Sequence, residues 1–228
     1  MQQGSRSTVA SIRVQAASSQ QQQGSLAASR GQVRNVTTAE FPKLLSEGWI
    51  VLDVRPPCEI EKAKLKNAVE IPLFVPDESS GLSTLIKKST AFGMGGWWLG
   101  GTHMIPNTDF LAQVQASIPD KEQAKVIVVC QKGLRSLSAC EQLVKIGYKT
   151  IAWVNGGLDT ARPGQVETAN NVDVRMGGVG GLSEVLGWTE VQQENGGGFA
   201  GGYQNILKAF AVILALDLVW FIWTILNP

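Results

Sequence analysis

Short apolar runs that alternate with helical patterns constrain the fold of this chain more than any other feature. Apolar runs of strand length, bounded by polar residues, predict buried strands, and apolar residues at helical spacing predict helices between them. The expected strands are residues 50–52, 126–129 and 150–154, and the expected helices are residues 108–117 and 136–146. Gly147 is placed to end the second helix as its C-terminal cap. Strands alternating with helices predict an α/β domain, in which helices wrap a parallel sheet.

The length of 228 residues and the 44% hydrophobic content suit one such domain with appendages. We expect the domain over residues 35–165. Residues 1–34 are rich in Ser, Gln and Ala, contain several arginines and have no acidic residue. This composition predicts an organellar transit peptide, and a disordered tail without a targeting role is the alternative.

A long stretch inside the expected domain, residues 72–106, has weak periodicity and contains the pair Trp97–Trp98. A long loop in a compact domain usually has a function, which here would be that of a lid or a docking surface. The alternative is that both tryptophans pack over the edge of the sheet.

Two further segments follow the domain. Residues 166–204 are polar and glycine-rich, which predicts a flexible linker. Residues 205–227 are predicted to form one transmembrane helix, because their apolar part would span roughly 27 Å as a helix. A buried core helix is the alternative. Asp217 interrupts the apolar run and would be protonated, or paired with a neighbouring protein, inside a membrane.

Charge and cysteine content exclude several classes of function. The formal net charge is +1 and the basic residues are scattered, so we expect no nucleic-acid partner. The three cysteines, Cys58, Cys130 and Cys140, form no CxxC pair. Neither a disulfide framework nor a metal site is therefore expected, and no cofactor is indicated.

The segment 130–136 carries the chemistry that we expect of this chain. Cys130 follows a strand and precedes a helix, so it stands at the carboxyl end of the sheet, where α/β domains bind ligands. Backbone N–H groups and the helix dipole would favour its thiolate. Gly133 permits a turn with positive φ, and Lys132 and Arg135 add positive charge. The alternative for Cys130 is a small buried apolar residue.

Four segments together resemble the rhodanese superfamily of sulfurtransferases. They are residues 52–56 with Glu59, residues 68–72, the loop 130–136 and residues 153–158. Within that superfamily the chain is most similar to single-domain chloroplast members from plants and green algae. The resemblance implies a rhodanese-like domain with a central parallel five-stranded sheet flanked by helices. It also implies a location at the thylakoid membrane, held by one span; because Lys208 and the other charges precede that span, we expect the domain to face the stroma.

The resemblance also implies an activity. Cys130 would take a sulfane sulfur from a small anionic donor such as thiosulfate, and would pass it as a persulfide to a thiol or to cyanide. The substrate-binding residues would be Gln131, Lys132, Gly133, Leu134, Arg135 and Ser136. Arg135 would contact the anion, while Asp53 and Arg55 would organise the surrounding structure. A thylakoid membrane protein complex is a further partner that we expect.

Other functions stay open at this point. Protein phosphatases share the rhodanese fold, but their loops have five residues between cysteine and arginine, whereas four separate Cys130 from Arg135 here. The domain could instead serve as a docking or redox-sensing module at the membrane. Cys58 could act as a resolving thiol if it lies close to Cys130. We expect Cys140 to be buried and His103 to form hydrogen bonds in a loop.

Overall fold

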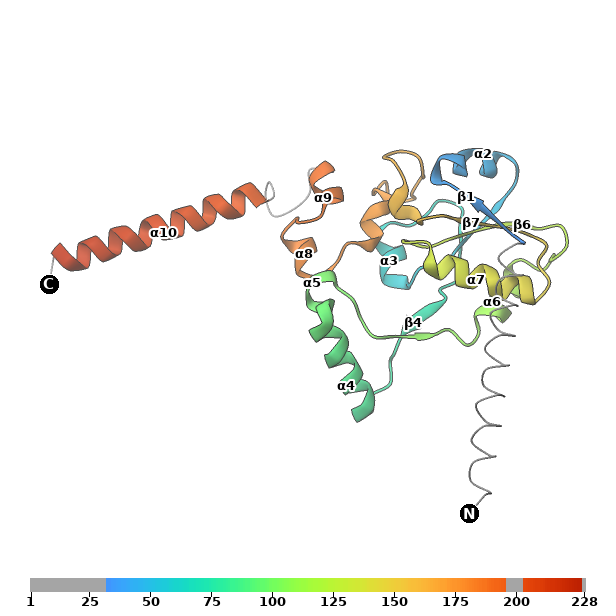
Figure 1. Cartoon of the computed structure of the whole chain (residues 1–228), viewed down its shortest axis with the longest axis horizontal. Coiled ribbons are helices and arrows are strands. Elements are labelled where there is room, and N and C mark those ends of the chain that lie inside the picture. The colour runs from blue at the N-terminus through green and yellow to red at the C-terminus, as the bar shows by residue number, and fades with distance from the viewer. Residues whose placement is uncertain (1–31, 196–202, 227–228) are drawn as a thin grey trace, which may run out of the picture.

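A five-stranded parallel sheet forms the centre of the computed structural model, which describes residues 32–195 and 203–226 (Figure 1). The strand order is β1-β7-β6-β2-β3, and all four neighbouring pairs are parallel. The strands are β1 (Val33–Val36), β2 (Ile50–Asp53), β3 (Val69–Glu70), β6 (Lys125–Val129) and β7 (Thr150–Val154). The predicted α/β domain with its parallel five-stranded sheet is confirmed.

Helices cover both faces of this sheet. The bounds of the longer ones are α2 (Phe41–Ser46), α3 (Pro57–Lys62), α6 (Phe110–Ser117) and α7 (Leu134–Lys145). Successive residues of β6 point to opposite faces. Val126 and Val128 join one core cluster with residues of α6 and α7, and Ile127 and Val129 join a second cluster that includes residues of α2. Each fully buried apolar side chain of this size contributes about 1.5–3 kcal/mol, so the central strands anchor the domain from both sides.

The boundaries of the elements differ slightly from the prediction. Helix α6 begins at Phe110, two residues later than expected, because the Asn107 side chain accepts a hydrogen bond from the Asp109 N–H and forms a turn there. Helix α7 starts at Leu134, directly from the cysteine loop, and Gly147 follows it with a φ of 103°. The prediction that Gly147 ends this helix is confirmed.

Strand β1 lies partly within the expected transit segment. Val33 and Arg34 pair with Ile151 and Ala152 of β7, so the folded domain begins before residue 35. Residues 1–31, on which the rest of that expectation falls, lie outside the described residues.

The stretch 72–106 contains regular elements that weak periodicity did not predict. Strands β4 (Phe74–Pro76) and β5 (Met104–Pro106) pair as an antiparallel hairpin. Between them lie α4 (Leu82–Ala91), the π-helical segment η2 (Phe92–Gly96) and α5 (Trp97–Leu99). Trp98 packs edge-on against Trp97 and Trp188, with ring centroids 5.5 and 6.0 Å apart. Its aromatic partners therefore belong to the insert and to the C-terminal segment.

Residues 166–195, expected to be part of a linker, fold onto the domain. They form η4 (Val174–Gly178), α8 (Gly181–Val185) and α9 (Glu190–Glu194). Val174 and Val179 are buried, and a Cβ on Gly177 would lie 2.7 Å from the Arg55 guanidinium. The glycines serve here for close packing, which composition alone cannot distinguish from a flexible linker. Residues 196–202 of that expected linker lie outside the described residues.

Helix α10 (Tyr203–Leu226) has 24 residues, and large apolar side chains along it are exposed. In the part of the chain that the structure describes, no helix qualifies by length and apolar character as able to cross a membrane. The expected transmembrane helix is therefore not found.

Candidate active site

Cys130 stands at the carboxyl end of β6, and its sulfur is surrounded by hydrogen-bond donors. Its Sγ accepts hydrogen bonds from the backbone N–H of Gly133, at 3.1 Å, and of Ser136, at 3.3 Å. The Ser136 hydroxyl lies 3.4 Å from the same sulfur and donates to the Gly133 carbonyl. Helix α7 begins within this loop, so the positive end of its dipole adds to the donors. The arrangement favours negative charge on the sulfur.

Glycine is required at position 133 for two reasons. Its φ is 86°, in the left-handed region. A Cβ there would also lie 3.1 Å from the Gly156 nitrogen and 3.2 Å from the Gly157 nitrogen. The loop can therefore curl around the sulfur only because this residue has no side chain.

The segment after β7 holds the cysteine loop from one side. Leu158 N–H donates to the Cys130 carbonyl at 3.0 Å, and Asp159 N–H donates to the Gln131 carbonyl at 2.9 Å. A Cβ on Gly157 would lie 2.5 Å from both the Cys130 carbonyl oxygen and the Gly133 nitrogen. From the sequence, residues 153–158 are noted only because they resemble a rhodanese segment. In the structure, Gly157 and Leu158 of this segment contact the cysteine loop.

The Gln131 side chain points into the protein. It is 1% exposed, and its amide nitrogen donates to the Asp159 carboxylate at 2.5 Å and to the Arg175 carbonyl at 3.2 Å. Its amide oxygen accepts from the Arg55 guanidinium at 3.4 Å. This side chain connects the loop to η4 and to the core, and a role of Gln131 in substrate binding stays a prediction.

Asp53 and Arg55 form a fully buried ion pair next to this amide. Arg55 Nη2 lies 2.7 Å from Asp53 Oδ2, and both side chains are inaccessible to solvent. Arg55 also donates to the Ala63 carbonyl at 2.8 Å. A buried pair of this kind tolerates the loss of neither partner, because an unpaired charge would remain in the core.

The rim of the loop carries two cationic side chains, Lys132 and Arg135. Lys132 and Leu134 are exposed, with Leu134 at 77%. Arg135 Nη2 lies 2.8 Å from Glu59 Oε2 of α3. Burial works against the charge of Arg135, but the Glu59 carboxylate, with the Cys130 sulfur, raises its pKa above the ordinary value. An anionic donor would therefore share this guanidinium with Glu59.

Asp159 is an acidic residue beside the loop that sequence reasoning did not identify. Burial raises the pKa of its carboxyl group, against the opposing effects of the Gln131 hydrogen bond and the positive charges of Lys132 and Arg135. The only signal in the sequence was its place directly after residues 153–158.

The remaining cysteines differ from Cys130 in their surroundings. Cys58 is exposed on α3, and partial burial, with the neighbouring Glu59 charge, raises its pKa. Cys140 is buried in α7 as expected, and burial strongly raises its pKa. Both environments favour the neutral thiol. His103 lies in the insert hairpin, with its Nε2 3.5 Å from Asp77 Oδ2.

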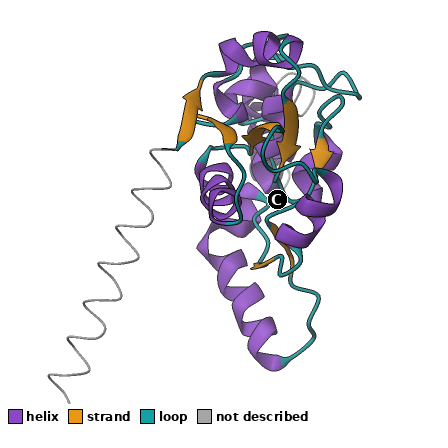
Figure 2. Cartoon of the chain, turned by 90° about the vertical axis from the view of Figure 1, so that its right-hand side faces the viewer, coloured by secondary structure: helices purple, strands orange, loops and turns teal. Residues whose placement is uncertain are grey.

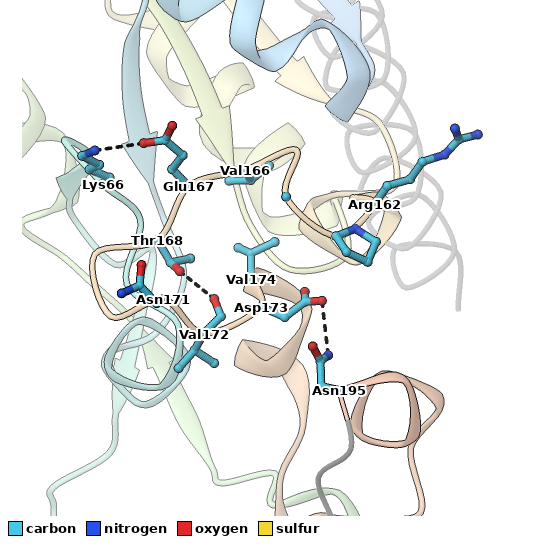
Figure 3. Close-up of a pocket in the computed structure, with 12 residues that line it drawn as sticks. Lys66, Arg162, Val166, Glu167, Thr168, Asn171, Val172, Asp173, Val174 and Asn195 are labelled. Atoms are coloured by element: carbon cyan, nitrogen blue, oxygen red, sulfur yellow. Dashed lines mark hydrogen bonds and ion pairs between the residues drawn. The ribbon is translucent and has the colours of Figure 1, made fainter.

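A cavity of about 360 Å³ lies elsewhere, along residues 162–174 (Figure 3). Lys66, Glu167 and Asp173 are among its lining residues, and none of residues 130–136 lines it. Within the described ranges, no group of three His, Cys, Asp or Glu side chains is placed to hold a metal ion.

Fold and site together define a class: an α/β domain that presents a cysteine in a cradle of backbone N–H groups. The Rhodanese-like domain family model matches residues 37–160, and the chain belongs to this family. It is 40% identical over 190 residues to the chloroplastic rhodanese-like domain-containing protein 11 of Arabidopsis thaliana, covering 82% of this chain and 64% of that protein. It is 41% identical over 158 residues to rhodanese-like domain-containing protein 10 of the same plant, covering 68% of this chain and 73% of that protein.

Among solved structures, a thiosulfate sulfurtransferase from Pseudomonas aeruginosa is similar at 18% identity with a TM-score of 0.35, covering 59% of this chain and 19% of that one. A likeness at this level supports no conclusion about activity. The chain covers 64% of the length of rhodanese-like domain-containing protein 11, which is less than two thirds.

Proposed function

We propose that this protein is a sulfurtransferase that carries sulfane sulfur as a persulfide on Cys130. The observation that carries the proposal is the pair of N–H groups, from Gly133 and Ser136, directed at the cysteine sulfur. They stabilise a thiolate before the reaction and an anionic persulfide after it.

The proposed reaction has two steps. The Cys130 thiolate attacks the outer sulfur of thiosulfate; a new S–S bond forms, the donor S–S bond breaks, and sulfite leaves with the bonding electrons. The terminal persulfide sulfur is then attacked by cyanide or by a thiolate, which returns Cys130 as a thiolate and yields thiocyanate or an acceptor persulfide. Atoms and charge balance in both steps, and no cofactor is needed. Lys132 and Arg135 would attract the anionic donor.

The test is thiosulfate:cyanide sulfurtransferase activity of the full chain, with intact-mass detection of a sulfur adduct. We expect Cys130→Ala to lose activity by at least about a thousandfold and to lose the adduct, because no other nucleophile can replace the thiolate. Cys58→Ala is the matched control, since Cys58 is the exposed cysteine, and it should keep both. A folded wild-type chain that takes up no sulfur would overturn the proposal.

A second candidate function is a docking or redox-sensing module without significant turnover. The observation that favours it is the complete burial of Cys130, which is 0% exposed. Turnover would require the loop to open for a donor, whereas docking would not. Sulfur uptake by the wild-type chain decides between the two candidates.

We also propose a chloroplast location, with attachment of α10 to the thylakoid membrane and the domain in the stroma. The similarity to the chloroplastic rhodanese-like domain-containing protein 11 and the exposed apolar side chains of α10 support this. Fractionation of chloroplasts that contain the full chain tests it. Recovery with thylakoids is the expected result, and recovery with soluble stroma would contradict it.

A further inference from the structure

The insert exposes an unusual number of large apolar side chains. Seven of them lie within eighteen consecutive positions, and Leu82 and Met94 are 75% and 84% exposed. We call these residues the insert surface: Leu82, Leu85, Ile86, Phe92, Met94, Trp97 and Leu99. Exposed apolar patches of this kind indicate an interaction site, because water contact with them is unfavourable.

Helix α4, which carries part of the insert surface, projects away from the sheet (Figure 2). Among its ten residues, only Thr84 is buried. A helix of this length is marginal in water without packing partners. Contact with an apolar medium would therefore stabilise the projecting helix.

The charged residues within the segment that carries the insert surface have a single sign. Between Ser79 and Thr108 the chain has no Asp or Glu, while Lys87 and Lys88 are exposed on α4. An amphipathic helix with apolar residues and lysines, accompanied by tryptophan, is typical of segments that lie in the interface of a membrane with anionic lipids.

The insert is joined tightly to the C-terminal segment. A Cβ on Gly100 would lie 2.6 Å from the Gly181 nitrogen, so α5 and α8 meet through glycines. Helix α8 and the turn after it extend the apolar face, because Leu182, Val185 and Trp188 are exposed by 41%, 56% and 52%. The insert surface and this extension therefore meet where α5 contacts α8.

The same segment leads to α10. Eight residues, 195–202, separate α9 from α10, and a chain of that length reaches no more than roughly 30 Å. If α10 is attached to a membrane, α8 and the insert beside it are kept within reach of the same membrane.

We infer that the insert surface, with Leu182, Val185 and Trp188, is a lipid-binding face that lays the domain against the membrane holding α10. This inference rests on the proposed membrane attachment of α10. The ligand is a bilayer surface containing anionic lipid, which the exposed lysines of α4 would contact.

Hydrogen exchange of the full chain, resolved by peptide, tests this inference. The chain is compared free and with vesicles of equal parts phosphatidylcholine and phosphatidylglycerol. We expect exchange in residues 82–99 to slow by at least about tenfold on the vesicles, since lipid contact stabilises α4. The double variant Leu85→Glu, Ile86→Glu should lose this protection. Leu45→Glu, at an exposed leucine of α2, is the matched control and should keep it.

The peptides separate the two proposals. Protection of α10 without protection of residues 82–99 would overturn the insert as a lipid-binding face and leave the attachment of α10 standing. No protection of either would overturn both. Protection of residues 82–99 that rises with protein concentration in the absence of vesicles would replace lipid by a second copy of the chain as the occupant.

Discussion

The cysteine loop and the insert differ in how far the rest of the protein fixes their structure. The loop is short, and its backbone is held by the segment after β7, where the N–H groups of Leu158 and Asp159 donate to the carbonyls of Cys130 and Gln131. The insert is long, and α4 leaves nearly every side chain exposed. The loop is therefore determined by the protein around it, whereas the insert surface depends on what it meets outside.

The difference teaches where function resides in each region. In the loop a fixed geometry aims the N–H groups of Gly133 and Ser136 at one sulfur atom. In the insert, the exposed apolar area is the functional property, and small changes of backbone there have little effect on it. Substitutions of the same kind should accordingly differ sharply in effect between the two regions.

The largest effect is expected from Asp53→Asn beneath the loop. The change leaves the Arg55 charge buried without its carboxylate partner, which costs about 3–5 kcal/mol in the free energy of unfolding. Urea unfolding of the full chain measures it. Lys88→Ala on α4 is the contrasting change and should alter stability by less than about 0.5 kcal/mol. Equal effects of the two substitutions would remove the proposed difference between the regions.

Gly157→Ala should have the next largest effect. Its Cβ would meet the Cys130 carbonyl oxygen at 2.5 Å at a φ of 70°, so the loop must shift, at a cost of about 2 kcal/mol and with loss of sulfur transfer. Gly93→Ala in the insert has open space around the new methyl group and should leave both stability and activity nearly unchanged. A fully active Gly157→Ala enzyme would contradict the tight clamp on the loop.

Asp159→Asn should have the smallest effect, visible only as a change with pH. The folded-state pKa of Asp159 is raised from 3.8, so its protonated form is favoured by folding, and wild-type stability falls as pH rises from 3.8 to the raised value. The asparagine of the variant does not titrate, so the urea midpoint of the variant should rise relative to that of wild type as pH increases over this range.

Asp77→Asn in the insert should show the opposite sign. Hydrogen bonds from Ser79 lower the Asp77 pKa from 3.8, so wild-type stability is present above that value and is lost as pH falls through the lowered pKa. The urea midpoint of wild type should therefore increase relative to that of this variant as pH rises. If the difference between variant and wild type changed with pH in the same direction for both substitutions, the opposite pKa shifts of Asp77 and Asp159 would be contradicted.

Much of the fold was predictable because β6 and β7 are continuous apolar runs with a clear length and period. The position of Cys130 after such a run was predictable for the same reason. Helix α4 was not predictable in this way, because its apolar residues are exposed and do not form a face that packs on the core. The fold of residues 174–194 was hidden as well, because glycines that permit close packing resemble glycines of a linker.

The sequence by itself determined the α/β class, the central strands, the family resemblance and the cysteine loop, because local periodicity and a short motif encode them. Only the tertiary structure decided that Gln131 faces the core, that Glu59 pairs with Arg135 and that Asp159 lies beside the loop. Each of these contacts joins residues at least 28 positions apart in the chain. Such neighbours are set by how the sheet stacks its strands and by which side chains share the space between them, which no local pattern contains.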